Sequence, residues 1–152
     1  MLKILLPTDG STRSLDAVHH ALQLVGRGLK AQFVVANVQA PANLYELVVA
    51  HDPAVLQKVS EAAGHDLMRP ALHVLQAAGF QPEQAVATGD PAHMLLEILE
   101  NHGCEAVIMS ARGGSESEEL SLGSVAQAMV DSCPVPITVV KPSTTEAADE
   151  TA

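Results

Sequence analysis

The chain has 152 residues, of which 47% are hydrophobic and 2% aromatic, and its formal net charge is −10. This length predicts one domain with a sizeable core, and the aliphatic composition argues against a disulfide-rich scaffold or a disordered chain. The 18 acidic residues outnumber the 8 basic ones, which argues against nucleic acids and anionic membranes as partners, because both are bound by clustered Lys and Arg.

The N-terminal segment "MLKILLPTDGS" is predicted to be a first strand rather than a leader. Pro7 and Asp9 interrupt its apolar run, and no small-residue cleavage site follows. No stretch reaches the roughly 18 continuous apolar residues of a membrane span, so we expect a cytoplasmic protein without a membrane partner. Cys104 and Cys133 lack the C-x-x-C spacing of a redox pair, and we expect both to be free thiols.

In the first half of the chain, residues 3–7 form a continuous apolar run, which is typical of a strand buried on both faces. Ser11 is placed to cap a helix, and a second strand is expected over 32–38. Asp52-Pro53 predicts the cap and first position of a long helix, which Pro70 should kink. The predicted core face of that helix consists of Leu56, Val59, Ala63, Leu67, Ala71, Val74 and Ala78.

The second half continues the alternation of strands and helices. Its elements are strand 84–89, a helix capped by Asp90-Pro91, strand 105–111, a helix from Gly123-Ser124 and strand 136–140. Residues 1–141 therefore form one predicted domain, and residues 142–152 are a small, acidic tail that we expect to be disordered.

Five strands separated by helices predict an α/β fold, a doubly wound five-stranded parallel sheet with the strand order 3-2-1-4-5. In such sheets, ligands bind beyond the carboxyl ends of the strands, where the strand order reverses direction. The turn at 7–11 and the loop at 110–124 would face this crevice together. Asp9 is there a candidate acceptor for a ribose hydroxyl or a base amine; its alternative role is to cap the first helix or stabilise the turn.

The segment "SARGGSESEELSLGSVA" (110–126) carries opposing signals. Its glycines expose backbone N–H groups, which favours anion binding, and a helix N-terminus follows. Three carboxylates lie between these glycines and would repel an anion: Glu116, Glu118 and Glu119.

The chain resembles the universal stress protein (UspA-like) family over about residues 1–141. The resemblance is carried by "KILLPTDGS", "VATGDPAHMLLEILEN", "EAVIMSARGG", "LGSVAQAMV" and "CPVPITVV". The family's ATP-binding signature is Gly, two residues, Gly, nine residues, Gly, then Ser or Thr. Here these positions are Ser110, Gly113, Gly123 and Ser124, so the spacing matches and a serine replaces the first glycine.

The resemblance implies an adenine nucleotide alpha hydrolase-like fold with an ATP site. Asp9 would meet the adenosine, the backbone of Val38 the adenine edge, and the glycine loop the ribose or phosphates. The implied binding residues are Pro7, Asp9, Val38, Ser110, Arg112, Gly113, Gly123, Ser124 and Val125. The resemblance also implies a homodimer formed by antiparallel contact of the last strand, with Ile137 to Val140 as the contact.

The glutamates depart from the family pattern, and three interpretations of them stay open. They face solvent and weaken binding, they help to hold Mg²⁺, or the loop no longer binds nucleotide. At an effective dielectric constant of about 20, a carboxylate roughly 6 Å from a phosphate charge would cost about 3 kcal/mol. Arg112 next to the loop would offset some of this repulsion; the alternative is a surface residue without effect on binding.

Other chemistries find no support in the sequence. It contains no Gly-Lys-Ser/Thr loop, no G-x-G-x-x-G fingerprint and no G-x-S-x-G elbow. Its seven histidines form no H-E-x-x-H pattern, so no metal site is expected. No catalytic residue can be named, which leaves at most weak ATP hydrolysis. We expect a cytoplasmic ATP-binding regulator of the stress response; the alternative is a nucleotide-free dimer that acts through protein interactions.

Overall fold

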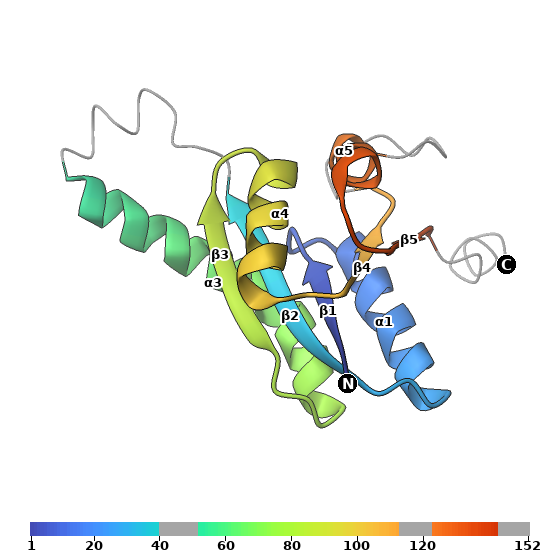
Figure 1. Cartoon of the computed structure of the whole chain (residues 1–152). Helices are drawn as coiled ribbons and strands as arrows, with labels where there is room; N and C mark the ends of the chain where they lie inside the picture. The colour runs from blue at the N-terminus through green and yellow to red at the C-terminus, as the bar shows by residue number, and fades with distance from the viewer. Residues whose placement is uncertain (40–51, 113–122, 143–152) are drawn as a thin grey trace, which may run out of the picture.

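Strands and helices alternate along the chain in the computed structural model, which describes residues 1–39, 52–112 and 123–142 (Figure 1). The elements are β1 (Leu2–Pro7), α1 (Thr12–Gly26), β2 (Ala31–Gln39), α3 (Pro53–Ala77), β3 (Glu83–Thr88), α4 (Pro91–His102), β4 (Ala106–Ser110), α5 (Ser124–Ser132) and β5 (Ile137–Val140). The tail over 143–152 lies outside the described residues, so its disorder stays a prediction.

The five strands form one parallel sheet with the order β3-β2-β1-β4-β5, which confirms the predicted fold class. The chain passes from β1 outward to β3 on one side and then returns to β4 on the other side of β1. The strand order therefore reverses direction between β1 and β4, which pair at Ile4↔Ala106 and Leu5↔Val107. A ligand site is expected beyond their carboxyl ends.

The sheet is buried on both faces, as the continuous apolar run at its first strand predicts. Along β1, Ile4 and Leu6 pack with α1 and α3, whereas Leu5 packs with α4 and α5. Successive side chains of a strand point to opposite faces, so such a strand needs apolar residues at every position. Figure 1 shows the result, with α1 and α3 on one face and α4 and α5 on the other.

Three of the predicted helix starts have the expected capping hydrogen bonds. The Ser11 hydroxyl accepts from the N–H of Ser14, and the carboxylates of Asp52 and Asp90 accept from the first turns of α3 and α4. Pro53 and Pro91 follow these aspartates at the first helical position, where a missing N–H costs nothing. Local sequence therefore determines where these helices begin.

The predicted core face of α3 is partly wrong. Val59 and Leu67 are 62% and 37% exposed, and the fully buried side chains are Met68, Ala71 and Leu75. The reason is that the first turns of α3 extend beyond the edge strand β3 (Figure 1), whereas later residues such as Ser60 and Gly64 approach Thr88 and Val86 of β3. The helix continues through Pro70, which lies on its exposed side.

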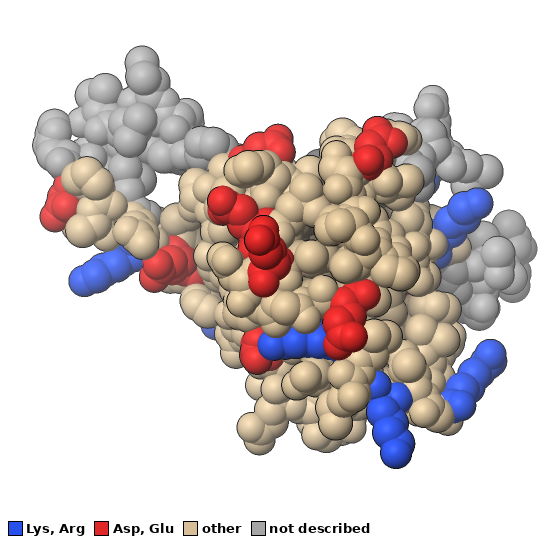
Figure 2. Space-filling view, viewed as in Figure 1, with Lys and Arg blue, Asp and Glu red and all other residues tan. Residues whose placement is uncertain are grey.

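The described surface agrees with the acidic composition. On the face that carries α4, acidic side chains lie over the helix and the starts of the neighbouring strands, and basic side chains lie mostly at the periphery (Figure 2). Within residues 1–39, 52–112 and 123–142, no helix combines the length and the hydropathy needed to cross a bilayer.

Candidate functional site

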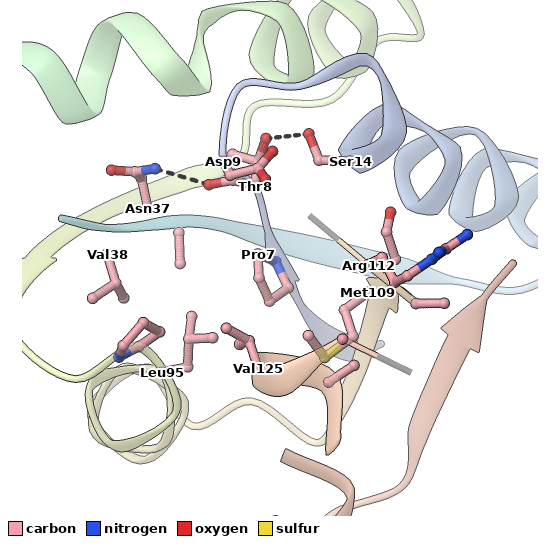
Figure 3. Close-up of a pocket in the computed structure, with 16 residues that line it drawn as sticks. Pro7, Thr8, Asp9, Ser14, Asn37, Val38, Leu95, Met109, Arg112 and Val125 are labelled. Atoms are coloured by element: carbon pink, nitrogen blue, oxygen red, sulfur yellow. Dashed lines mark hydrogen bonds between the residues drawn. The ribbon is translucent and has the colours of Figure 1, made fainter. Parts of the chain in front are cut away.

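A cavity of about 210 Å³ opens at the carboxyl ends of β1, β2 and β4 (Figure 3). This is the position at which the strand order reverses. Residues at or just after the carboxyl ends of these strands contribute to its wall, and α4 and the start of α5 close it from the other face of the sheet. The lining consists of Pro7, Thr8, Asp9, Ser14, Ala36, Asn37, Val38, Pro91, Leu95, Met109, Ser110, Ala111, Arg112, Gly123, Val125 and Ala126.

Most of the site residues expected from the sequence lie in this one wall. They come from four separate segments of the chain: Pro7, Asp9, Val38, Ser110, Arg112, Gly123 and Val125. Ser124 is not part of the lining, although it is the first residue of α5 and adjoins Gly123 and Val125, which are. Gly113 and the three glutamates lie outside the described residues.

The wall also contains polar residues that the sequence reasoning missed. Thr8, Ser14 and Asn37 are buried and line the cavity. Thr8 and Asn37 directly adjoin the predicted residues Asp9 and Val38. A polar side chain at the carboxyl end of an otherwise apolar strand, as Asn37 is in "FVVANV", was the available signal. Pro91 and Leu95 give no such signal, because their place in the wall depends on how α4 packs.

Asp9 both stabilises the turn after β1 and lines the cavity. Its Oδ1 atom accepts a hydrogen bond from the Ser11 N–H at 2.9 Å, which stabilises the turn after β1. The capping of α1 belongs to Ser11 instead. The Asp9 side chain remains exposed and lines the cavity, so a carboxylate is present at the opening of an otherwise largely apolar pocket.

Ser110, which replaces the first glycine of the signature, uses its hydroxyl within the protein. Its Oγ donates to the carbonyl of Arg13 at 2.6 Å and so ties the end of β4 to the first turn of α1. The hydroxyl of Ser110 is therefore directed toward the first turn of α1.

Arg112 is buried, with 8% of its surface exposed. In Figure 3 its guanidinium extends toward α1, and the residue belongs to the cavity lining. Arg112 and Asp9 are the charged residues of the described lining. The pocket thus has one positive and one negative group on the side of the sheet that carries α1.

The N-terminus of α5 lies at the cavity. Gly123 is the N-cap, contributes no side-chain cap and is anchored by a hydrogen bond from its N–H to the Ala111 carbonyl at 2.7 Å. The first-turn N–H groups and the helix dipole place partial positive charge here, which favours an anion. An anion would therefore be accommodated where Gly123 and Val125 line the wall.

A second polar cluster lies at the opposite end of the sheet. Glu83, the first residue of β3, contacts Lys3 Nζ at 3.1 Å and His102 Nδ1 at 2.7 Å. The hydrogen bond from His102, followed by that from Lys3, lowers the pKa of the Glu83 carboxyl below its ordinary value. This cluster joins β1, β3 and α4 but is remote from the cavity, because Glu83 and Lys3 lie at the starts of their strands.

Among the residues described, no three His, Cys, Asp or Glu side chains come together as metal ligands. The cavity wall therefore contains no donor set for a metal of its own. A Mg²⁺ ion there would depend on a ligand's phosphates or on residues beyond the described ranges.

Comparison with known proteins identifies relatives of this chain. The family model described as "Universal stress protein family" matches residues 1–141. Universal stress protein MJ0577 of Methanocaldococcus jannaschii is 26% identical over 153 residues, covering 91% of this chain and 94% of the relative. The solved structure of MJ0577 superposes with a TM-score of 0.76 at 25% identity, over 93% of this chain and 96% of that one.

Two further solved structures with the same fold contain nucleotides. One is a universal stress protein in complex with cAMP, with a TM-score of 0.62 and 23% identity over 91% of this chain and 95% of that one. The other is a universal stress protein family protein of Arabidopsis thaliana with AMP bound, with a TM-score of 0.66 and 15% identity over 96% and 95%. With a family match that spans the whole sheet and its helices, and with this shared fold, the chain belongs to the universal stress protein family.

Proposed function

We propose that the protein binds an adenine nucleotide, ATP in the first place, in the cavity beyond β1 and β4, and acts as a cytoplasmic regulator in the stress response. The observation that carries the proposal is the convergence of four separate segments on one cavity that ends at the N-terminus of α5. The AMP and cAMP complexes of proteins with this fold support an adenine ligand.

The wall suits the parts of a nucleotide. Apolar residues such as Leu95 and Met109 would pack against the base, and the backbone of Val38 at the end of β2 would meet its polar edge. The Asp9 carboxylate would accept hydrogen bonds from the ribose hydroxyls or the base amine. The phosphates would lie toward Gly123 and the first turn of α5, where partial positive charge is available.

Ser110 is no obstacle to this arrangement. A serine at a position where a ligand approaches the backbone would block it only if its hydroxyl pointed into the cavity. The hydroxyl instead donates to the Arg13 carbonyl. Replacement of glycine by serine at this position is therefore compatible with nucleotide binding.

The three glutamates at 116, 118 and 119 keep their three interpretations, which titrations separate. Repulsion predicts that Glu116→Ala or Glu118→Ala tightens ATP binding in the absence of Mg²⁺. Metal binding predicts that the same changes weaken ATP binding only in the presence of Mg²⁺. A loop that no longer binds nucleotide predicts no saturable ATP binding under either condition.

The competing function is a nucleotide-free dimer that acts through protein contacts, and the acidic loop of this chain favours it. Isothermal titration calorimetry of the purified protein with ATP, AMP and cAMP, each with and without Mg²⁺, decides between the two. Saturable binding of any of them supports the nucleotide site. The absence of saturable binding at millimolar concentrations under all conditions contradicts it.

We also propose that the protein forms a homodimer through β5, and the position of β5 at the edge of the sheet supports this. Among the described residues β5 is an edge strand that pairs only with β4. The carbonyls of Pro136 and Val140 accept from the N–H groups of Val107 in β4 and of Ala111, which directly follows β4. Because backbone groups alternate along a strand, the N–H and C=O groups of Ile137 and Val139 point away from β4, where a second copy would add its own β5.

A further inference from the structure

Asn37 lies beneath the turn that carries Asp9. It is the last fully buried residue of β2, with 3% of its surface exposed. Its side-chain amide donates to the Thr8 carbonyl at 2.9 Å, and the N–H of Thr8 donates to the Ala36 carbonyl at 2.9 Å (Figure 3). Pairing of β1 with β2 ends at Pro7↔Ala36, so beyond the ladder the Asn37 side chain supplies a donor to the carbonyl of the residue before Asp9.

The orientation of the Asn37 amide follows from the Thr8 carbonyl, which can only accept a hydrogen bond, so the amide nitrogen faces Thr8. Its Oδ1 then accepts from Nε2 of Gln39. The Asn37 side chain therefore accepts a hydrogen bond from Gln39 of β2 and donates one to Thr8 in the turn.

A directed chain of hydrogen bonds continues from Thr8 around the turn. Oγ of Ser14 donates to the Ser11 carbonyl at 2.7 Å, which uses its only hydrogen. In the 2.8 Å contact between the two hydroxyls, Thr8 must then be the donor and Ser14 the acceptor. Thr8 Oγ1 also accepts from the Gly10 N–H at 3.3 Å. The backbone on both sides of Asp9 is thus held by side chains that lie in the cavity wall.

Helix α3 supports this arrangement from behind. A Cβ atom on Gly64 would lie 3.3 Å from Oδ1 of Asn37, and one on Gly10 would lie 2.6 Å from Cδ2 of Leu67. Gly10 also has φ = +84°, which favours glycine. Close approach of α3 at these two glycines leaves Asn37 and the turn little freedom to move.

We propose that Asn37 is the positioning residue of the nucleotide site: through the Thr8 carbonyl it fixes the turn after β1 and so directs the Asp9 carboxylate at the ligand. This inference rests on the proposed function, because it assigns the turn a role in nucleotide binding. The amide nitrogen and oxygen of Asn37 are engaged by Thr8 and Gln39, so we infer that it acts through the turn. Its contribution is the orientation of Asp9, and displacement of a binding group by about 1 Å is enough to cost an order of magnitude or more.

The test begins without nucleotide. Asn37→Leu keeps the approximate shape of the side chain but removes the donor to Thr8. Amide hydrogen exchange at Gly10 and Ser11, measured by NMR, should accelerate by at least about tenfold, because both N–H groups depend on the turn. Exchange at Leu99 in α4 should not change. Gln39→Ala is the matched control, since it removes the contact on the acceptor side of Asn37 and should leave Gly10 and Ser11 unaffected.

Nucleotide binding gives the second readout. Asn37→Leu should weaken ATP binding by about tenfold in the wild-type background and by less than about twofold in Asp9→Asn, because the effect is transmitted through Asp9. Asp9→Asn retains an Oδ1 acceptor for the Ser11 N–H but removes the charge and replaces the second carboxylate oxygen with an NH₂ donor. If Asn37→Leu does not fold, Ser14→Ala cuts the same chain at its other end and should change both readouts in the same direction.

Unchanged exchange at Gly10 and Ser11 overturns the inference, as does a loss of affinity of equal size in both backgrounds. Acceleration by Gln39→Ala to the same extent also overturns it, because the effect is then not specific to Thr8. If the wild-type protein binds no adenine nucleotide, the proposed function fails together with the ligand half of this inference. The exchange rates still decide independently whether Asn37 holds the turn.

Discussion

Replacement of Gly64 by alanine should destabilise the protein, although alanine is the better helix former. A Cβ atom at this position in α3 would lie 2.5 Å from Cγ1 and 2.9 Å from Cγ2 of Val86. Because both γ carbons are too close, rotation of the Val86 side chain does not relieve the overlap, and the helix must move from the sheet. Overpacking of this kind costs about 2–3 kcal/mol and the helix propensity returns about 1 kcal/mol, so a net loss of about 1–2 kcal/mol is expected.

Urea denaturation followed by circular dichroism measures this difference. Gly26→Ala is the matched control, because Gly26 lies in α1 with nothing within 4 Å of an added Cβ atom; it should be neutral or stabilising by up to about 1 kcal/mol. The double variant Gly64→Ala/Val86→Ala should recover at least about 1 kcal/mol relative to the sum of the single changes. Stabilisation by Gly64→Ala, equal to that of Gly26→Ala, would refute the close contact of α3 with β3.

Three further predictions follow from the sheet and its contacts. Val139→Pro removes an N–H that faces away from β4, so sedimentation velocity should show a monomer with an unchanged circular dichroism spectrum; a persistent dimer would exclude β5 as the contact. Ser110→Ala removes the donor to the Arg13 carbonyl and should lower the free energy of unfolding by about 1 kcal/mol without weakening ATP binding, and a large loss of affinity would contradict the assigned orientation. The lowered pKa of Glu83 means that its contribution to stability is present above the ordinary value of 4.5 and is lost as the pH falls through the folded-state pKa. The difference in stability between wild type and Glu83→Gln should accordingly vanish in acid, and a difference that persists unchanged would argue against the hydrogen bonds of Glu83.

Much of the fold could be predicted because it is encoded locally. Ser11, Asp52 and Asp90 begin helices through contacts with their own first turns. The run that follows Lys3, at residues 4–7, is apolar at every position, which is typical of a strand covered on both faces. Most of the site residues that could be predicted lie at or just after the carboxyl ends of strands, where parallel topology brings them to one edge of the sheet.

The features that could not be predicted from the sequence are those that depend on tertiary packing. The buried face of α3 depends on where the helix crosses β3, and glycine at position 64 determines this contact although it carries no hydrophobic signal. Arg112 resembled a surface residue in sequence and is buried in the structure. The role of Asn37 depends on a partner 29 residues away in the chain, and no local pattern reveals such a pair.

Calorimetric titration of ATP measures whether the cavity binds nucleotide. It compares the wild-type protein with Gly123→Val and Gly26→Val. Gly123 has φ = −69° and ψ = 165°, a conformation that valine adopts readily, so the change adds volume to the cavity wall without strain. Wild type and Gly26→Val should bind ATP saturably with equal affinity, and Gly123→Val should bind at least about tenfold more weakly. Saturable binding that survives Gly123→Val unchanged would show that nucleotide binds elsewhere. No binding to the wild type at millimolar ATP, with and without Mg²⁺, would show that the protein has no ATP site.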